Sequence, residues 1–322
     1  MMRTEHVDVV AERDPGAGLA ARRVPMGRGN VMVGPVAHLV AERQRLDGLR
    51  WEHFDARRLG ATIGAVIDGV DLTGPLPAEV VSELRRALLD YKVLFFREQP
   101  LRAEQHVAFA RRFGDLEIHP FIPGNPDFPE LVRFAKSADV AGYENAWHSD
   151  VSWRERPSMG AVLHAVEVPS TGGDTLFADM YAAYDGLDEP DRARVDDLAA
   201  VHDYMRAFSG QVPPERHDEM RAKYPLVTHP VVRTHDETGR RLLYVNRYFV
   251  QRIVGMGDEE SEDLIEWLSR QADTIEYQCR WQWEPHSVAF WDNRAVQHYA
   301  CSDYWPSVRV MERASIIGAR PV

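Results

Sequence analysis

Cysteine is scarce in this sequence. Only Cys279 and Cys301 occur among 322 residues. They form neither a disulfide framework nor a Cys-x-x-Cys pair of the kind that binds zinc. We therefore expect two unpaired thiols, buried as small apolar side chains, in a protein of the reducing cytoplasm.

Long apolar runs are also missing. The longest early stretch, residues 31–40, contains Gly34, Pro35 and His38, and it is far shorter than the roughly 20 apolar residues of a membrane-spanning helix. The first residues lack the basic start and apolar run of a signal peptide. We expect a cytoplasmic protein that does not enter a membrane.

Positive charge is outweighed by negative charge. The chain has 38 Lys and Arg against 50 Asp and Glu, a net charge of −12, and no basic run. Such a surface repels a phosphate backbone, so nucleic acid is not an expected partner.

The chain divides into a leader and one domain. Residues 1–50 mix Arg, Gly, Pro and charged residues without a sustained period, which predicts a flexible N-terminal arm. Residues 51–322 are long enough to bury a core without a disulfide or a structural metal.

Strand patterns outnumber helix patterns in that domain. Helical periodicity appears over 77–91, 103–113 and 258–271. Turn signals predict hairpins around 236–239 and 284–285. Strand patterns appear at 93–97, 160–168, 175–179, 227–234, 241–248, 274–283, 286–292 and 308–317.

Many short strands with few helices favour an α+β, β-rich fold. We expect a double-stranded β-helix (jelly roll) core with flanking helices. The polar stretch 203–223 fits no strand and is expected to be a mobile cover over a site, as is 139–146.

The first candidate for chemistry is His148-Ser149-Asp150. In a strand, residues i and i+2 point to the same face, so this imidazole and carboxylate could bind one metal ion. Alone the pattern is weak, because a second His-x-Asp at His53-Phe54-Asp55 has no supporting partners.

His298 strengthens the case, because it follows an apolar strand that ends at Asp292. Two imidazoles and one carboxylate on one side of a ferrous ion leave three coordination positions open. Zinc prefers a tetrahedral site and has no redox chemistry.

Two arginines share a strand face further on. Alternation places Arg309, Met311, Arg313 and Ser315 on one face. A buried guanidinium needs an anion, and its planar fork matches a carboxylate. Internal salt bridges with Asp or Glu are the alternative explanation.

Three segments together resemble the taurine/aryloxyacetate (TauD/TfdA) dioxygenase family. They are WHSDVSW at 147–153, PSTGGDTLFADMYAAYDGL at 169–187 and WDNRAVQHYACSDYWPSVRVMERASIIG at 291–318. The segments LGATIGAVIDGVDL and VLFFREQPL are similar to that family's N-terminal blocks. The resemblance covers residues 59–320.

The resemblance implies an Fe(II)- and 2-oxoglutarate-dependent enzyme. It implies that His148, Asp150 and His298 bind the iron. Thr175 would hydrogen-bond the distal carboxylate of 2-oxoglutarate, and Arg309 would form an ion pair with it. The residues that match substrate-contacting positions are His119, Phe208, Phe249 and Arg313.

Some positions depart from the taurine enzyme's pattern. Ile122 stands where that enzyme has a tyrosine, and Tyr143-Glu144 replaces Asp-Asn. Taurine is therefore a doubtful substrate, whereas retention of Arg313 favours a substrate with one anionic end. Halogenating relatives lack the iron carboxylate, so Asp150 favours hydroxylation.

We predict hydroxylation of a small sulfonate, sulfate ester or carboxylate, with O2 as co-substrate and succinate and CO2 as co-products. One alternative is a tailoring hydroxylase for a larger carboxylated natural product, with Ile122, Tyr143, Trp153 and Met205 lining a roomier pocket. Another is a non-catalytic β-sandwich that binds a metal or small acid. A zinc hydrolase lacks support, because no general-base Glu adjoins the His-x-Asp motif. By analogy with the family we expect a homo-oligomer.

Overall fold

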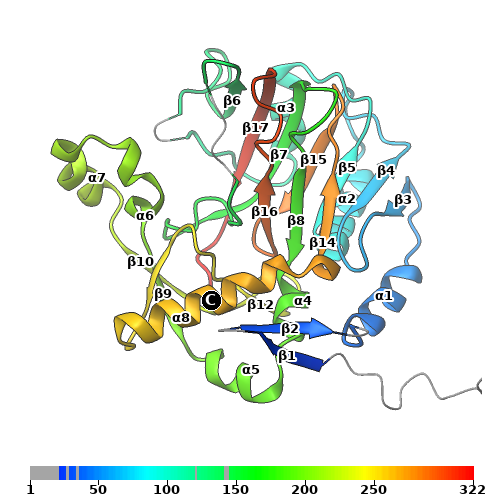
Figure 1. Ribbon diagram of the computed structural model, residues 1–322. Helices are drawn as coiled ribbons and strands as arrows, with labels where there is room; N and C mark the ends of the chain where they lie inside the picture. The colour runs from blue at the N-terminus through cyan, green and yellow to red at the C-terminus, as the bar shows by residue number, and fades with distance from the viewer. Residues whose placement is uncertain (1–21, 27–28, 34–35, 120–121, 141–144) are drawn as a thin grey trace, which may run out of the picture.

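The structure is a computed structural model that describes residues 22–26, 29–33, 36–119, 122–140 and 145–322. Two β-sheets form its central body (Figure 1). The smaller has the order β14-β8-β16, with bounds Gln278–Trp281, Thr175–Asp179 and Val296–Ala300. The larger has the order β3-β4-β5-β15-β7-β17-β6, with bounds Asp55–Arg58, Ala65–Asp68, Val93–Phe96, Val288–Asp292, Ser158–Glu167, Arg309–Ile317 and Leu131–Lys136.

The sheets pack face to face through aromatic side chains. Phe95 of β5 stacks on Trp281 of β14 with ring centroids 4.3 Å apart. Phe177 of β8 lies 5.8 Å from Trp291 of β15, also between ring centroids. Burying such large rings between two sheets is a main source of stability in a sandwich, and the arrangement fits the predicted β-rich jelly roll.

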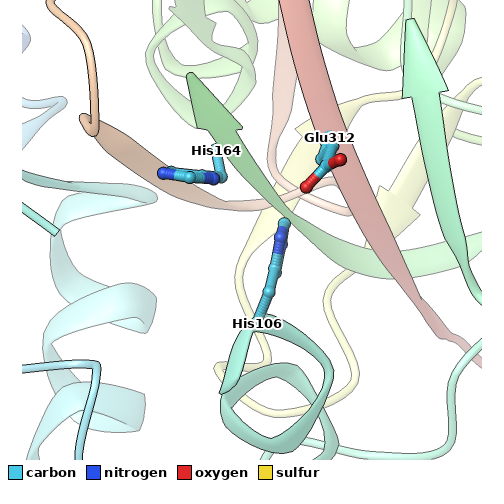
Figure 2. A group of neighbouring side chains, drawn as sticks. All are labelled: His106, His164 and Glu312. Atoms are coloured by element: carbon cyan, nitrogen blue, oxygen red, sulfur yellow. The ribbon is translucent and has the colours of Figure 1, made fainter. Parts of the chain in front are cut away.

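Two helices cover the other face of the large sheet. α2 (Ala78–Tyr91) and α3 (Ala103–Arg111) contribute apolar side chains to a cluster with Phe290 and Ile316. Three polar side chains meet between α3 and this face of the sheet (Figure 2). They are His106 on α3, His164 on β7 and Glu312 on β17.

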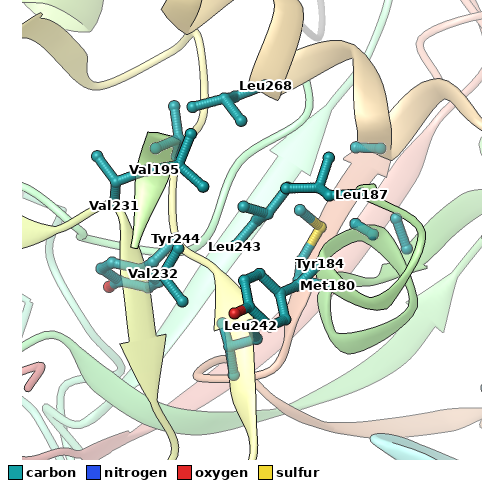
Figure 3. Close-up of a cluster of buried hydrophobic side chains, with 14 of the residues drawn as sticks. Met180, Tyr184, Leu187, Val195, Val231, Val232, Leu242, Leu243, Tyr244 and Leu268 are labelled. Atoms are coloured by element: carbon teal, nitrogen blue, oxygen red, sulfur yellow. The ribbon is translucent and has the colours of Figure 1, made fainter. Parts of the chain in front are cut away.

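A second apolar cluster lies beyond the small sheet (Figure 3). It joins α4 (Met180–Asp185) and α8 (Asp258–Ser269) to short strands. Other elements are α5 (Glu189–Val195), β9 (Ala199–His202), β10 (Val227–Pro230), β11 (Val232–Thr234), β12 (Arg241–Leu243) and β13 (Val250–Ile253), with a separate hairpin of β1 (Arg22–Met26) and β2 (Gly29–Val33).

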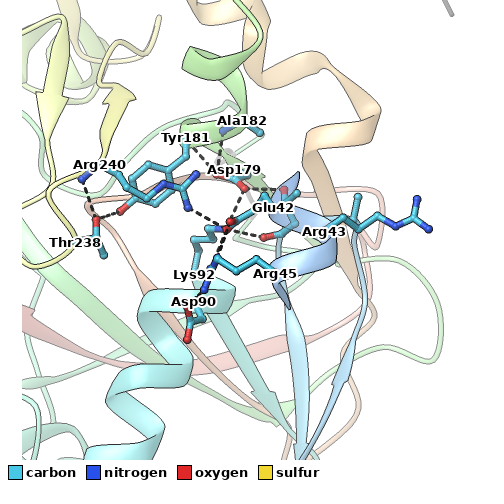
Figure 4. A network of polar contacts seen from close by, with 12 residues as sticks. Glu42, Arg43, Arg45, Asp90, Lys92, Asp179, Tyr181, Ala182, Thr238 and Arg240 are labelled. Carbon is cyan, nitrogen blue, oxygen red and sulfur yellow. Dashed lines mark hydrogen bonds and ion pairs between the residues drawn. The ribbon is translucent and has the colours of Figure 1, made fainter. Parts of the chain in front are cut away.

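The last part of the predicted flexible or loosely docked arm over 1–50 includes a helix. Helix α1 (Leu39–Asp47) docks on the domain, with Leu39 and Leu46 buried. Its Glu42 accepts from the buried Lys92 at 3.1 Å and from Arg240 at 2.9 Å (Figure 4). A composition rich in charge predicts solvent exposure, but here the charges are paired with partners distant in sequence.

Most predicted elements are observed, and one predicted hairpin is wrong. The turn around 236–239 joins the antiparallel pair β11-β12. Around 284–285 the chain instead crosses between sheets, because β14 pairs with β8 whereas β15 pairs with β5 and β7. A turn signal is local and does not specify which strand a neighbour pairs with.

The polar stretch 203–223 is helical. It contains α6 (Tyr204–Phe208) and α7 (His217–Lys223), joined by two short 3-10 turns, and it extends from one side of the body (Figure 1). Tyr204, Met205 and Met220 pack on Trp153 and Phe249. Its action as a mobile cover stays a prediction.

Within the described residues, we find no helix whose length and hydropathy would let it cross a bilayer.

Candidate active site

Three side chains predicted to bind iron come together beside β16 of the small sheet. His148 and Asp150 lie on a loop, and His298 lies on β16. A single antiparallel bridge joins His148 to His298, with backbone hydrogen bonds of 3.2 and 2.9 Å. The sequence pattern indicated a strand at His148, whereas only this one bridge forms, and Val151 turns the chain away with φ 48°.

The donor atoms fit a metal ion. Asp150 Oδ1 lies 3.7 Å from His148 Nε2 and 3.8 Å from His298 Nε2, and one ligand atom from each residue lies within 4.8 Å of the others. His148 Nδ1 hydrogen-bonds the Ala146 carbonyl at 2.8 Å, which leaves Nε2 for a metal. The set of two imidazoles and one carboxylate suits Fe(II) with open positions.

Burial and charge keep His298 and Asp150 in the states that bind a metal. Burial lowers the pKa of His298 to about 3, and nearby His148 and Arg313 add to the effect. Burial acts to raise the pKa of Asp150, but the charge of Arg313 and the contacts with His298 and His148 hold that pKa well below its usual range. Neutral imidazoles and an ionised carboxylate are the forms that coordinate metals.

Arg313 lies beside the metal ligands. Its Nη1 donates to both oxygens of Asp150, at 3.0 and 2.9 Å. The alternative explanation from the sequence, an internal salt bridge, therefore holds for this arginine. Its Nε is nevertheless buried without a hydrogen-bond partner, which leaves one donor available to a further acceptor.

A cavity of about 90 Å³ is lined by the two histidines of this group, His148 and His298. Arg309, Met311 and Arg313 all line it, so the predicted strand face is confirmed. Thr175 lines it too, and its Oγ1 accepts a hydrogen bond from Trp283 Nε1 at 3.0 Å. One cavity thus contacts the imidazoles and Arg309.

Three residues at the site were missed from the sequence. Asn293 Oδ1 accepts from the Asp150 backbone at 2.7 Å, and its Nδ2 donates to the Asp150 carbonyl at 3.0 Å. Lys136 pairs in register with Arg309 and lines the cavity. Trp283 supports Thr175. Only Asn293 had a usable signal, as a polar residue directly after a buried strand.

The predicted substrate contacts lie at different depths. Phe249 is buried, and its ring centroid lies 6.1 Å from that of His148. The ring centroid of Phe208 lies 6.0 Å from that of Phe249. Tyr248, which was not predicted, is closer to His148 at 5.5 Å. Burial, with the charges of Arg313 and Arg154, lowers the pKa of His119 to about 4.

The roomier pocket of the alternative hypothesis is not formed as proposed. Trp153 and Met205 are buried in the apolar cluster beneath α6 and α7, so neither lines the cavity. Ile122 is half-buried. Tyr143 and Glu144 lie outside the described residues.

Comparisons with known proteins agree with this geometry. The family model described as "Taurine catabolism dioxygenase TauD, TfdA family" matches residues 55–315. An alpha-ketoglutarate-dependent sulfate ester dioxygenase of Pseudomonas putida is 36% identical over 84% of this chain and 91% of its own. A (S)-phenoxypropionate/alpha-ketoglutarate-dioxygenase of Sphingobium herbicidovorans is 35% identical over 82% of this chain and 95% of its own.

A solved structure supports the fold. The crystal structure of a taurine dioxygenase from Burkholderia xenovorans superposes with a TM-score of 0.74 at 38% identity, covering 84% of this chain and 91% of that one. The predicted jelly roll and the family resemblance are confirmed.

Proposed function

The chain belongs to the TauD, TfdA dioxygenase family and is an Fe(II)- and 2-oxoglutarate-dependent dioxygenase, and from this premise we propose its ligand-binding residues and substrate class. His148, Asp150 and His298 hold the iron. Thr175 and Arg309 hold the distal carboxylate of 2-oxoglutarate, and Arg313 with His119 receives an anionic substrate. One observation supports this most directly: the three metal donors cluster within 4.8 Å of one another, and the two imidazoles among them line one cavity with Arg309.

Arg309 and Thr175 are suited to a carboxylate. The guanidinium donates from Nε to the Gly173 carbonyl at 3.2 Å, which orients its fork. The Thr175 hydroxyl accepts from Trp283, so its own proton is available to donate to an anion. The two groups fix 2-oxoglutarate at the end remote from the iron. When bound, Fe(II) and 2-oxoglutarate supply O2 activation and the oxidising power for hydroxylation, with succinate and CO2 as products.

Arg313 supports an anionic substrate. Its unpartnered Nε is buried near the metal donors, and a buried cationic donor strongly favours an anion. His119 is neutral near pH 7 because its pKa is about 4, so it contributes a hydrogen bond and no charge. Anchoring the anion would place the adjacent C–H beside the iron, and positioning is the protein's main contribution to rate.

Sulfate esters are the substrates we favour within this class. The support is the 36% identical relative named as a sulfate ester dioxygenase. The relative named for phenoxypropionate supports carboxylates as the second group to test. The non-catalytic binding hypothesis has no support from these enzymes. The burial of Trp153 and Met205 in an apolar cluster leaves the hypothesis of a larger natural product as substrate without support.

The test measures succinate formed with Fe(II), 2-oxoglutarate and a panel of alkyl sulfates, sulfonates and carboxylates. We expect Asp150→Ala to abolish it. Asp55→Ala is the matched control, because Asp55 ends the other His-x-Asp motif and is exposed on β3, and it should leave turnover unchanged. Full turnover in Asp150→Ala would refute the metal assignment, and stimulation by none of the panel would refute the substrate class.

We also propose that the chain works in the cytoplasm as a homo-oligomer. Two free cysteines, one buried and one half-buried, suit a reducing compartment. The oligomer rests on analogy with the family. Light scattering coupled to size-exclusion chromatography tests the oligomeric state. A single species of 36.7 kDa, the mass of one chain, would contradict a homo-oligomer.

A further inference from the structure

A second group of metal-binding residues lies on the face of the large sheet that α3 covers. His106, His164 and Glu312 each offer one ligand atom, and these atoms lie within 4.8 Å of one another. His164 and Glu312 are directly opposite each other on the paired strands β7 and β17. His106 reaches them from α3, so three separate elements converge here (Figure 2).

This group is separate from the iron site. Glu312 and Arg313 are consecutive on β17, so their side chains point to opposite faces of the sheet. Arg313 lines the catalytic cavity, which neither His106 nor His164 lines. Nothing in the proposed reaction uses these histidines.

The histidines have unused nitrogens. His106 is fully buried and its Nε2 bonds the Val162 carbonyl at 2.9 Å, so Nε2 carries the proton and Nδ1 is left with a lone pair and no partner. His164 is 3% exposed. A contact with the Gln99 backbone acts to raise its pKa, but neither ring nitrogen has a partner with full hydrogen-bond geometry. Buried polar atoms without partners are rare in folded proteins and indicate a missing water or ion.

The chemistry of the group suits zinc. Burial lowers the pKa of His106 to about 3 and that of His164 to about 4, so both are neutral at pH 7, as coordination requires. The bond from His106 to a carbonyl is the support that metal-binding histidines usually have. Glu312 binds Arg133 through Oε1 at 2.7 Å, and a carboxylate has a second oxygen for a metal.

We propose that His106, His164 and Glu312 form a second metal site that binds Zn²⁺, with water as the fourth ligand, and that the ion joins α3 to β7 and β17. Two imidazoles and one carboxylate are an established zinc ligand set. Bound zinc stabilises the folded chain, because the unfolded chain does not bring these residues together.

The experiment removes the iron site first, because that site also binds zinc. The background is full-length protein carrying His148→Ala and His298→Ala. After dialysis against excess zinc and then metal-free buffer, bound zinc is counted by mass spectrometry. We expect one zinc per chain, and a melting temperature about 3–5 °C above that of the metal-free protein.

The decisive variants add His164→Asn or Glu312→Gln to this background, and each should abolish both the bound zinc and the thermal shift. His217→Asn is the control, since His217 lies on α7 and bonds the Val212 carbonyl, and it should retain one zinc. If His164→Asn does not fold, Glu312→Gln decides, because that side chain is partly exposed. No zinc in the background protein, or zinc retained after Glu312→Gln, would overturn the proposal.

Discussion

At the scale of single residues, the site depends on buried charges that neutralise one another. Asp150 is 6% exposed and is paired with Arg313. Asp292, one residue before Asn293, is paired with Arg294 at 2.7 Å and with His235 at 3.0 Å. Removing one partner of such a pair leaves an uncompensated charge, which costs more than the pair itself contributes.

Arg309 gives the first prediction. Because a charge-assisted bond contributes about 1.5–3 kcal/mol, Arg309→Ala should raise the apparent Michaelis constant for 2-oxoglutarate at least about tenfold. The measurement is succinate formation against 2-oxoglutarate concentration. Arg320→Ala, at an exposed arginine paired only weakly with Glu155, should change nothing. An unchanged constant in Arg309→Ala would make Arg309 a purely structural residue.

Asn293 gives the second prediction. Its side chain binds the Asp150 backbone twice and the Ser158 carbonyl once. Asn293→Ala should lower iron affinity about 10–100-fold by loosening the loop that carries Asp150. Iron titration followed by ligand-field absorption measures this. Asn125→Ala, which removes a turn contact to Asp127, is the control, and equal losses in both variants would contradict the positioning role.

At the scale of elements, the turn before β8 positions Arg309. Gly173 has φ +71°, and a Cβ there would lie 3.2 Å from Arg309 Cδ and Nε. Its backbone N–H donates to Asp303 at 2.8 Å while its carbonyl accepts from Arg309. A residue without a side chain is therefore required for both the backbone conformation and the close approach.

The third prediction concerns Gly173→Ala, and Gly239→Ala is its matched control. Gly239 also has positive φ, at +66°, but a Cβ there meets nothing within 4 Å. Both changes should cost about 1–2 kcal/mol of stability. Only Gly173→Ala should raise the apparent constant for 2-oxoglutarate, by about threefold or more, because it displaces Arg309. An equal rise of the apparent constant for 2-oxoglutarate in both variants would show that displacement of Arg309 is not the cause.

At the scale of the whole molecule, burial of histidine makes stability depend on pH. Burial lowers the pKa of His106 to about 3, those of His164 and His229 to about 4, and that of His202 well below 6.5. Above pH 6.5 these groups are neutral in both states. Below it the unfolded chain binds protons that the folded chain cannot, so stability falls as pH decreases.

The fourth prediction follows from these shifts. In chelator-treated protein, the free energy of unfolding should fall by about 1 kcal/mol per buried histidine between about pH 7.5 and 5.5, or by about 4 kcal/mol for these groups together. Denaturant titration at both pH values measures the change. His229→Gln should reduce it by about a quarter. Equal stability at the two pH values would contradict the assigned protonation states.

The sequence by itself determined what depends on neighbours along the chain. Alternation placed Arg309, Met311 and Arg313 on one face, and helix periodicity located α2, α3 and α8 close to their observed bounds. The ordered motifs indicated the family, and with it His148, Asp150 and His298. These features follow from the geometry of a strand or helix, which a few adjacent residues define.

Only the tertiary structure decided which distant residues meet. It paired β14 with β8 and not with β15, docked α1 through Glu42 and Lys92, joined Asp150 to Arg313 and Asn293, and brought His106 against His164 and Glu312. Each of these contacts joins separate segments of the chain. Their identity depends on how whole sheets and helices pack, because no local pattern encodes the partner that a buried polar group finds.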